Sequence, residues 1–345
     1  MVKANEIDGL DCEADVLSGI KVVLATRLAE MCMLRANALN FEDIEGVHDM
    51  RVASRRLRSA IGDFSVFVRR RDLRRLKKGI RDVAGALGGV RDEDVAIAAL
   101  EKLAGKAPAE IADGIERLTD ERRRARDEQR GMLLNAIAEE RLARIQQRWH
   151  VALDEVTLAS RWREKSEQTG AGFDHLMFRD AGRIIITERW NELELLSSAL
   201  YRPHETIPLH EMRIAAKKLR YAIELFAQCW GDAMIPFAKE IASMQSALGE
   251  LHDCDVWIEW LGEMLEARNG GRGNSRATSP SNEVYRQNRK AAGYLLRHFA
   301  GERTKHFRDA LAQWGEWETS NFGTRLAAQL QQHLSASATA VAANQ

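Results

Sequence analysis

Proline, aromatic residues and cysteine are all scarce in this sequence. Its 345 residues include 5 prolines and 4 cysteines, and only 6% are aromatic. A hydrophobic fraction of 45% excludes a disordered polymer, and the composition excludes collagen-like and disulfide-scaffold proteins. Few prolines combined with many Ala, Leu, Arg and Glu residues favour helix over sheet. The length fits two domains of ordinary size.

The sequence also lacks a long hydrophobic run and any net charge. Its longest apolar runs, such as 22–25, are far too short to span a bilayer, and residues 1–15 are too polar for a signal peptide. The four cysteines stand apart with no CxxC pair, so we expect reduced thiols rather than disulfides. They are Cys12, Cys32, Cys229 and Cys254. These features predict a soluble, cytoplasmic protein.

The chain repeats itself at an offset of about 162 residues. VHDMRVASRRLRSAIGDF at 47–64 and LHEMRIAAKKLRYAIELF at 209–226 are identical at nine of eighteen positions. IKVVLATR and AEER match GRIIITER and AGER at the same offset, and ALGGVRDEDV matches ALGELHDCDV at an offset of 161. Separate blocks on nearly one diagonal predict a duplicated domain. We place the first repeat at 13–165, the second at 173–320 and a C-terminal tail at 321–345.

Apolar residues at three- and four-residue spacing predict an all-α fold of two helical bundles. The expected helices cover about 13–40, 47–68, 72–88 and 110–160 in the first half, and 175–202, 209–229, 236–249 and 282–318 in the second. We expect a further helix to begin near Asp92 and near Asp253, whose short acidic side chains suit N-caps. A flexible loop is expected at 269–281, and fraying beyond Leu334.

The second helix of each half is expected to carry a basic stripe opposite an apolar one. The basic residues are His48, Arg51, Arg55 and Arg58 in the first half and His210, Arg213, Lys217 and Arg220 in the second. Neighbouring like charges repel, so their presence in both copies suggests that something negative neutralises them. Both histidines are placed in the first turn, where free N–H groups suit an anion, although a capping or core role is equally open.

Basic residues concentrate around the first of these helices. Residues 47–91 contain 13 Arg and Lys against 4 Asp within a chain of zero net charge. Further candidates for anion binding come from the third helix and the last helix: Arg74, Lys77, Lys78, Arg81, Arg286, Arg289, Lys290 and Arg297. The alternative is an ordinary solvated surface paired with carboxylates.

The paired motifs H-x-x-R-[VI]-A-x-[RK]-[RK]-L-R, each followed by ALG-x-x-[RH]-D-x-D-V, resemble the CHAD domain, the conserved histidine α-helical domain. The resemblance covers roughly 13–317. It implies two pseudo-symmetric four-helix bundles, a basic central groove and binding of inorganic polyphosphate, often at polyphosphate granules. The family's basic positions correspond to His48, Arg51, Arg55, Arg56, Arg58, His210, Arg213, Lys217, Lys218 and Arg220. The family's Arg-Asp pair matches Arg91–Asp92, but the second copy has His252–Asp253 instead.

The sequence favours a stand-alone binding protein over an enzyme. It contains no HExxH motif, no Cys/His cluster at zinc spacing and no Walker loop, so we expect no catalytic residue, metal site or cofactor. A polyphosphate hydrolase or kinase and a nucleic-acid binder remain alternatives. A third is a protein-interaction scaffold that uses Trp257, Trp260, Trp314 and Trp317, although this spacing is more typical of core residues.

Overall fold

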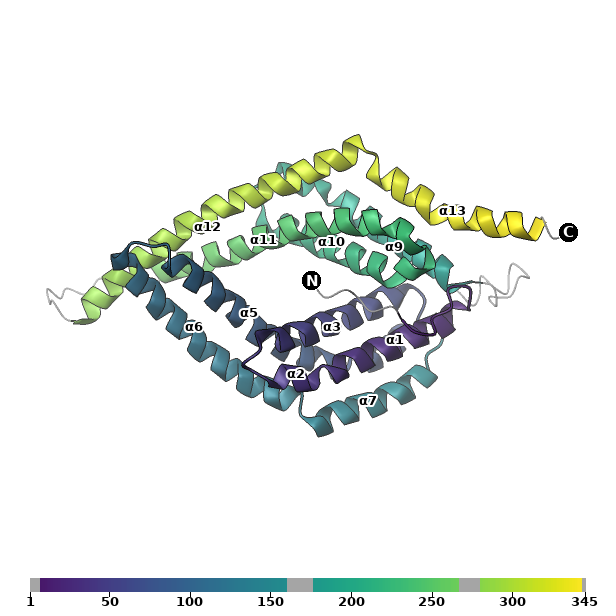
Figure 1. Ribbon diagram of the computed structural model, residues 1–345, viewed down its shortest axis with the longest axis horizontal. Coiled ribbons are helices and arrows are strands. Elements are labelled where there is room, and N and C mark those ends of the chain that lie inside the picture. Colours follow the sequence, from purple (N-terminus) through teal and green to yellow (C-terminus); the bar gives the residue numbers. More distant parts are fainter. Residues whose placement is uncertain (1–6, 160–175, 267–279, 343–345) are drawn as a thin grey trace.

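A computed structural model describes residues 7–159, 176–266 and 280–342 of the chain. Within these ranges the regular structure is helical, and the β-type pairings are the isolated bridges Asp15–Met177 and Val68–Leu158 (Figure 1). The prediction of an all-α fold is therefore confirmed. No described helix combines the length and the apolar character that crossing a bilayer requires.

The helices form two sets that follow each other along the chain. The first set is α1 (Val16–Met33), α2 (Arg35–Leu39), α3 (Ile44–Asp63), α4 (Arg70–Lys77), α5 (Ile80–Ala104), α6 (Ala109–Ala136) and α7 (Glu139–Asp154). The second set is α9 (Phe178–Leu195), α10 (Thr206–Phe226), α11 (Ile235–Glu266), α12 (Pro280–Thr319) and α13 (Phe322–Ala342). In each set the long helices pack in chain order: α1 on α3, α3 on α5 and α5 on α6, then α9 on α10, α10 on α11 and α11 on α12.

Among the described residues, the two sets pack most extensively through three pairs of helices. α1 packs on α9, α3 on α10 and α6 on α12, so the sets lie side by side (Figure 1). Phe64, Phe178 and Phe226 meet at one end of this contact, with ring centroids 4.8 to 6.2 Å apart. A second apolar cluster joins α5 and α6 to α11 and α12 at the other end and includes Leu100 and Leu295. Apolar burial therefore holds the sets together at both ends.

The expected helix starts at Asp92 and Asp253 are wrong, because both residues lie inside continuous helices, α5 and α11. Gly88 and Gly89 precede Asp92 within α5, no proline interrupts this segment, and the helix continues. Gly89 allows a close approach by α6, since a Cβ there would lie 2.2 Å from Gln129 Oε1. Packing against α6 thus offsets the roughly 1 kcal/mol that a helical glycine costs relative to alanine.

Other helix boundaries also differ from those expected. The helix at 72–88 divides into α4 and α5 at Gly79, whose φ of 89° is readily adopted only by glycine. The helix at 110–160 divides into α6 and α7 around Ile137. The chain beyond Leu334 continues as α13 to Ala342. Most of the loop expected at 269–281 and the expected boundary between the repeats lie outside the described residues.

The expectation of four reduced thiols is also wrong. Cys12 and Cys229 form a disulfide across a sequence separation of 217 residues, with their Cα atoms 5.5 Å apart. The bond joins the segment before α1 to the segment after α10, and no local spacing motif reveals a pair so distant in sequence. Cys32 is half-buried and Cys254 is buried, and both are free thiols.

Candidate functional site

A cavity of about 660 Å³ opens between the two sets of helices. α3 and α10 contribute cationic side chains to its lining. α5 and α11 line the rest of its length with residues between 84 and 96 and between 245 and 260. The apolar stripes of α3 and α10, including Met50, Leu57, Met212 and Leu219, are buried in the core. The basic stripes occupy the opposite helix faces, and both of them contribute residues to the lining of this cavity. The cationic residues that line it are Arg51, Arg55, Arg58, Arg122, Arg213 and Lys217.

Residues about 161 or 162 positions apart line the cavity as pairs. Arg51 corresponds to Arg213 at this offset, and Arg55 corresponds to Lys217. Gly88 and Gly249 form another such pair, and each has open space where a Cβ would stand. Two basic stripes that are far apart in the sequence therefore converge on one space.

The stripe cations have few anionic partners of their own. Arg51 donates to Asp92 across 2.9 Å. Arg55, Arg58, Arg213 and Lys217 have no carboxylate within 4 Å among the described residues. Burial and the nearby Arg55 and Arg213 guanidinium groups lower the pKa of Lys217 to about 8. Positive charge is therefore crowded enough in the cavity to disfavour protonation of this lysine.

Two histidines pair at the edge of the cavity. The Nδ1 atoms of His210 and His252 lie 3.2 Å apart, so one ring donates a hydrogen bond to the other. Burial, together with Arg213, lowers the pKa of His252 to about 4 and also lowers the pKa of His210. Both rings are therefore mainly neutral at pH 7, so one Nδ1 carries a proton and the other Nδ1 accepts the hydrogen bond. The departure from the Arg-Asp motif at His252 thus supplies a hydrogen-bond partner for His210.

His48 lies in a different setting from His210. Burial and then Arg91 lower the pKa of His48. Both histidines are the fifth residues of their helices, because α3 begins at Ile44 and α10 at Thr206, so their expected place in the first turn is wrong.

Glu45, His48 and Asp49 place one ligand atom each within 4.8 Å of one another and could together hold a metal ion. The positive charges of Arg51 and Arg91 lie close to His48 and repel a cation at this cluster.

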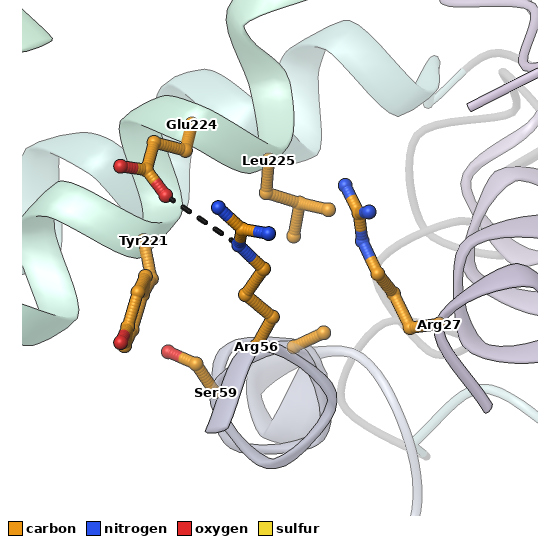
Figure 2. Close-up of a pocket in the computed structure, with 7 residues that line it drawn as sticks. Arg27, Arg56, Ser59, Tyr221, Glu224 and Leu225 are labelled. Carbon is orange, nitrogen blue, oxygen red and sulfur yellow. Dashed lines mark ion pairs between the residues drawn. The ribbon is translucent and has the colours of Figure 1, made fainter. Parts of the chain in front are cut away.

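Three of the candidate binding residues on α3 and α10 are engaged elsewhere. The Arg56 guanidinium lies 3.9 Å from Glu224 of α10, beside Arg27 and Tyr221 (Figure 2). The space next to these side chains, about 10 Å³, admits at most a water molecule. Arg220 is buried and donates to Glu224 and Gln245 over 2.7 and 3.1 Å. Lys218 lies 2.5 Å from Glu192 on α9.

The candidates outside the repeated helices do not line the cavity. Arg74, Lys77, Lys78 and Arg81 are exposed on α4 and the start of α5. Lys78 borders a separate hollow with Arg141, Arg144 and Arg148. On α12, Arg289 donates to the Leu265 carbonyl and Lys290 lies 3.4 Å from Glu110. Arg286 and Arg297 are exposed on the same helix.

Sequence reasoning missed several residues that do line the cavity. Arg122 of α6 contributes a guanidinium 4.2 Å from the ring centroid of Trp260, and it lies 3.3 Å from Glu93. No basic residue occupies the equivalent position in the other half, so the repeat gave no sign of Arg122. The sequence did contain a signal for the α11 side of the cavity. His252, Val256 and Trp260 are spaced four residues apart, which places all three on one face of α11.

The four tryptophans considered as contact residues divide into two groups. Trp314 and Trp317 are buried against Trp190, with ring centroids 6.0 and 5.9 Å from it, and are core residues. Trp257 and Trp260 are only half-buried and line the cavity.

Comparison with known proteins supports the fold. A crystal structure of the CHAD domain from the plant Ricinus communis matches with a TM-score of 0.65 and 22% identity, over 90% of this chain and 95% of that one. PptA from Streptomyces chartreusis matches with a TM-score of 0.56 and 18% identity, over 88% of this chain and all of that one. No curated protein matches the sequence. The family model of the CHAD domain matches residues 22–262, and this chain therefore belongs to the CHAD domain family.

Proposed function

We propose that this protein binds inorganic polyphosphate in the cavity between α3, α5, α10 and α11. The observation that carries the proposal is the convergence of Arg51, Arg55, Arg213 and Lys217, from two separate stripes, on one space. Polyphosphate is a linear chain of anionic units, so one molecule can contact both stripes at once and gain from multivalency. Charge-assisted hydrogen bonds from guanidinium groups suit phosphate oxygens.

The shape of the cavity favours a single chain over a nucleic-acid duplex. A duplex presents its phosphates on the outside of a wide cylinder, whereas these cations lie on two neighbouring helices, α3 and α10, and border one space. A thin chain can lie between the stripes and contact both. Polyphosphate binding of this kind would also account for an association with polyphosphate granules.

We propose binding without turnover. The two aspartates that line the cavity, Asp92 and Asp253, face Arg51 and Arg213. Arg51 donates to Asp92, and Arg213 opposes the burial that raises the pKa of Asp253. Their charge is thus offset by the neighbouring guanidinium groups, which disfavours a metal-assisted hydrolysis or transfer.

Calorimetric titration with long-chain polyphosphate, single-stranded DNA and double-stranded DNA tests this function. We expect polyphosphate to bind most tightly, and Arg51→Glu/Arg55→Glu or Arg213→Glu/Lys217→Glu to abolish measurable binding. Each charge-assisted hydrogen bond is worth roughly 1.5–3 kcal/mol, and reversal adds repulsion. Lys305→Glu/Arg308→Glu is the matched control, because it makes the same change in net charge at exposed positions of α12.

The outcomes separate the site from net charge. The cavity is supported as the binding site if the control retains binding, the two cavity variants lose it, and the circular dichroism of every variant is unchanged. Equal losses in all three double variants would show that net charge governs binding and would overturn the assignment. Tighter binding of either DNA than of polyphosphate would replace the proposed ligand by nucleic acid.

A further inference from the structure

The cavity changes character along its length. His210 contacts His252 and Arg220 contacts Gln245, so α10 runs antiparallel to α11, and Arg51 of α3 contacts Asp92 of α5. α3 and α10 reach their N-termini soon after the level of Asp92 and Asp253. α5 and α11 extend further in the same direction. The cationic stripes therefore end partway along the cavity, and α5, α6 and α11 line the remainder.

This remaining part is largely apolar and aromatic, and the guanidinium of Arg122 lies over it, 4.2 Å from the ring centroid of Trp260. Val95 and Val256 are 45% and 51% exposed although both are aliphatic, and the half-buried Trp257 and Trp260 lie next to them. Trp260 lies seven residues beyond Asp253, about 10 Å along the helix. An inorganic phosphate chain has no apolar atoms, so this surface offers it no favourable contact.

A carboxylate accompanies the aromatic surface. Glu93 lines the cavity 3.3 Å from Arg122, and its Oε2 is buried without a hydrogen-bond partner among the described residues. Carboxylates repel ionised phosphates but accept hydrogen bonds from hydroxyl and amino groups. A ligand that suits this end therefore carries N–H or O–H donors next to a flat apolar group.

We propose that the cavity also accommodates a nucleoside oligophosphate, with its phosphates on the stripe cations and its base against the tryptophan surface. The inference rests on the proposed function, because the phosphates would use the same Arg51, Arg55, Arg213 and Lys217. Bases stack on aromatic side chains, and acidic residues accept hydrogen bonds from ribose hydroxyls in nucleotide sites. The cavity volume of about 660 Å³ lies within the range of small-molecule sites.

A pair of ligands that differ only by the nucleoside tests the inference. Adenosine 5′-tetraphosphate and inorganic tetraphosphate are titrated separately into the full chain by calorimetry. We expect the adenosine form to bind about tenfold more tightly, because base stacking adds to the phosphate contacts, and to change the tryptophan fluorescence. Equal or weaker binding of the adenosine form overturns this inference and leaves polyphosphate binding standing. Failure of both ligands and of long-chain polyphosphate to bind at low salt overturns both proposals.

Two variants locate the nucleoside. Val256→Glu places a carboxylate on the apolar surface without disturbing the core, and Trp260→Leu removes the ring beneath Arg122. Both should bring the affinity ratio of the two ligands close to one. Val151→Glu, at a 57% exposed position of α7, is the matched control and should leave the ratio unchanged. A ratio that survives both Val256→Glu and Trp260→Leu, in folded protein, overturns the assignment of the nucleoside to this surface.

Discussion

His210 and His252 share one proton between Nδ1 atoms 3.2 Å apart, beside the guanidinium of Arg213. Burial and Arg213 hold the pKa of His252 at about 4, against about 6.5 for an unperturbed histidine. Between these values the unfolded chain takes up a proton that the folded chain does not. The folded state is therefore disfavoured on acidification.

We expect the contribution of His252 to the free energy of unfolding to be full above pH 6.5 and to fall as the pH drops toward 4. Asp63, whose pKa is raised by burial to about 6, acts in the opposite direction, so the comparison must be between variants. His252→Asn should lose less stability than the wild type between pH 7 and pH 5 in denaturant titrations. His150→Asn, at an exposed position, should behave like the wild type. Parallel pH profiles for all three proteins would contradict the assigned protonation state.

Lys217 predicts a second pH dependence, in ligand binding. With a pKa of about 8, Lys217 loses its charge as the pH rises from 7 to 9, whereas Arg55 and Arg213 stay charged. A phosphate ligand favours the charged lysine, so affinity for polyphosphate should fall over this range and proton uptake should accompany binding at pH 8. Calorimetry in buffers of different ionisation enthalpy measures that uptake. Lys217→Arg should flatten the profile, and a variant as pH-sensitive as the wild type would point to another group.

His48 and Arg51 are neighbours on α3 but should contribute unequally to binding. Arg51 lines the cavity, whereas His48 does not and carries no charge at neutral pH. We expect Arg51→Ala to weaken polyphosphate binding by tenfold or more and His48→Ala by only a few fold. Titration at fixed salt measures both. A larger loss from His48→Ala would reverse this ranking.

The Cys12–Cys229 disulfide should contribute measurably to stability. Bonds that close long loops typically add about 2–4 kcal/mol to the free energy of unfolding. Cys12→Ser, Cys229→Ser and the double variant should therefore lose similar amounts in denaturant titrations, and a reductant should lower the wild type to the same level. A reductant effect that persists in Cys12→Ser would mean that another pair of thiols is responsible.

Two glycines of α3 offer a matched test of packing. A Cβ at Gly46 would lie 2.1 Å from the backbone oxygen of Asn37, whereas a Cβ at Gly62 would meet nothing within 4 Å. Gly46→Ala should lower the free energy of unfolding by about 1–3 kcal/mol, and Gly62→Ala should raise it by up to about 1 kcal/mol. Equal effects in thermal denaturation would show that the close approach of α2 and α3 is not tight in solution.

Sequence periodicity predicted the all-α class and the two basic helices because each has a long apolar stripe that must be buried. The apolar residues from Met50 to Phe64 and from Met212 to Phe226 are in the core as expected. The same reasoning failed at Asp92, because α5 continues through two glycines despite their low helix propensity: Gly89 packs closely against Gln129 of α6, and Gly88 borders the cavity. The duplication itself remains a prediction from the sequence.

Only part of the candidate site could be predicted in the same way. Repetition identified Arg51, Arg55, Arg213 and Lys217, which line the cavity. It also selected Arg220, which is buried with Glu224 as its partner, because identical residues in two copies can serve packing as well as binding. Arg122 could not be predicted from the repeat. It comes from α6, and it lines the cavity only because α6 packs next to α5 and α11.

The contacts at both ends of the molecule have a consequence for what can enter the cavity. Gly114 of α6 lies so near α12 that a Cβ would come within 2.7 Å of the Ala291 methyl group, and a Cβ at Gly19 of α1 would come within 2.2 Å of the Phe178 ring of α9. Walls joined at both ends resist the hinge motion by which two-domain proteins open around bulky ligands. Under the proposed function, the fixed width of the cavity would therefore limit which polyanions can reach the stripe cations, in addition to the effect of their charge.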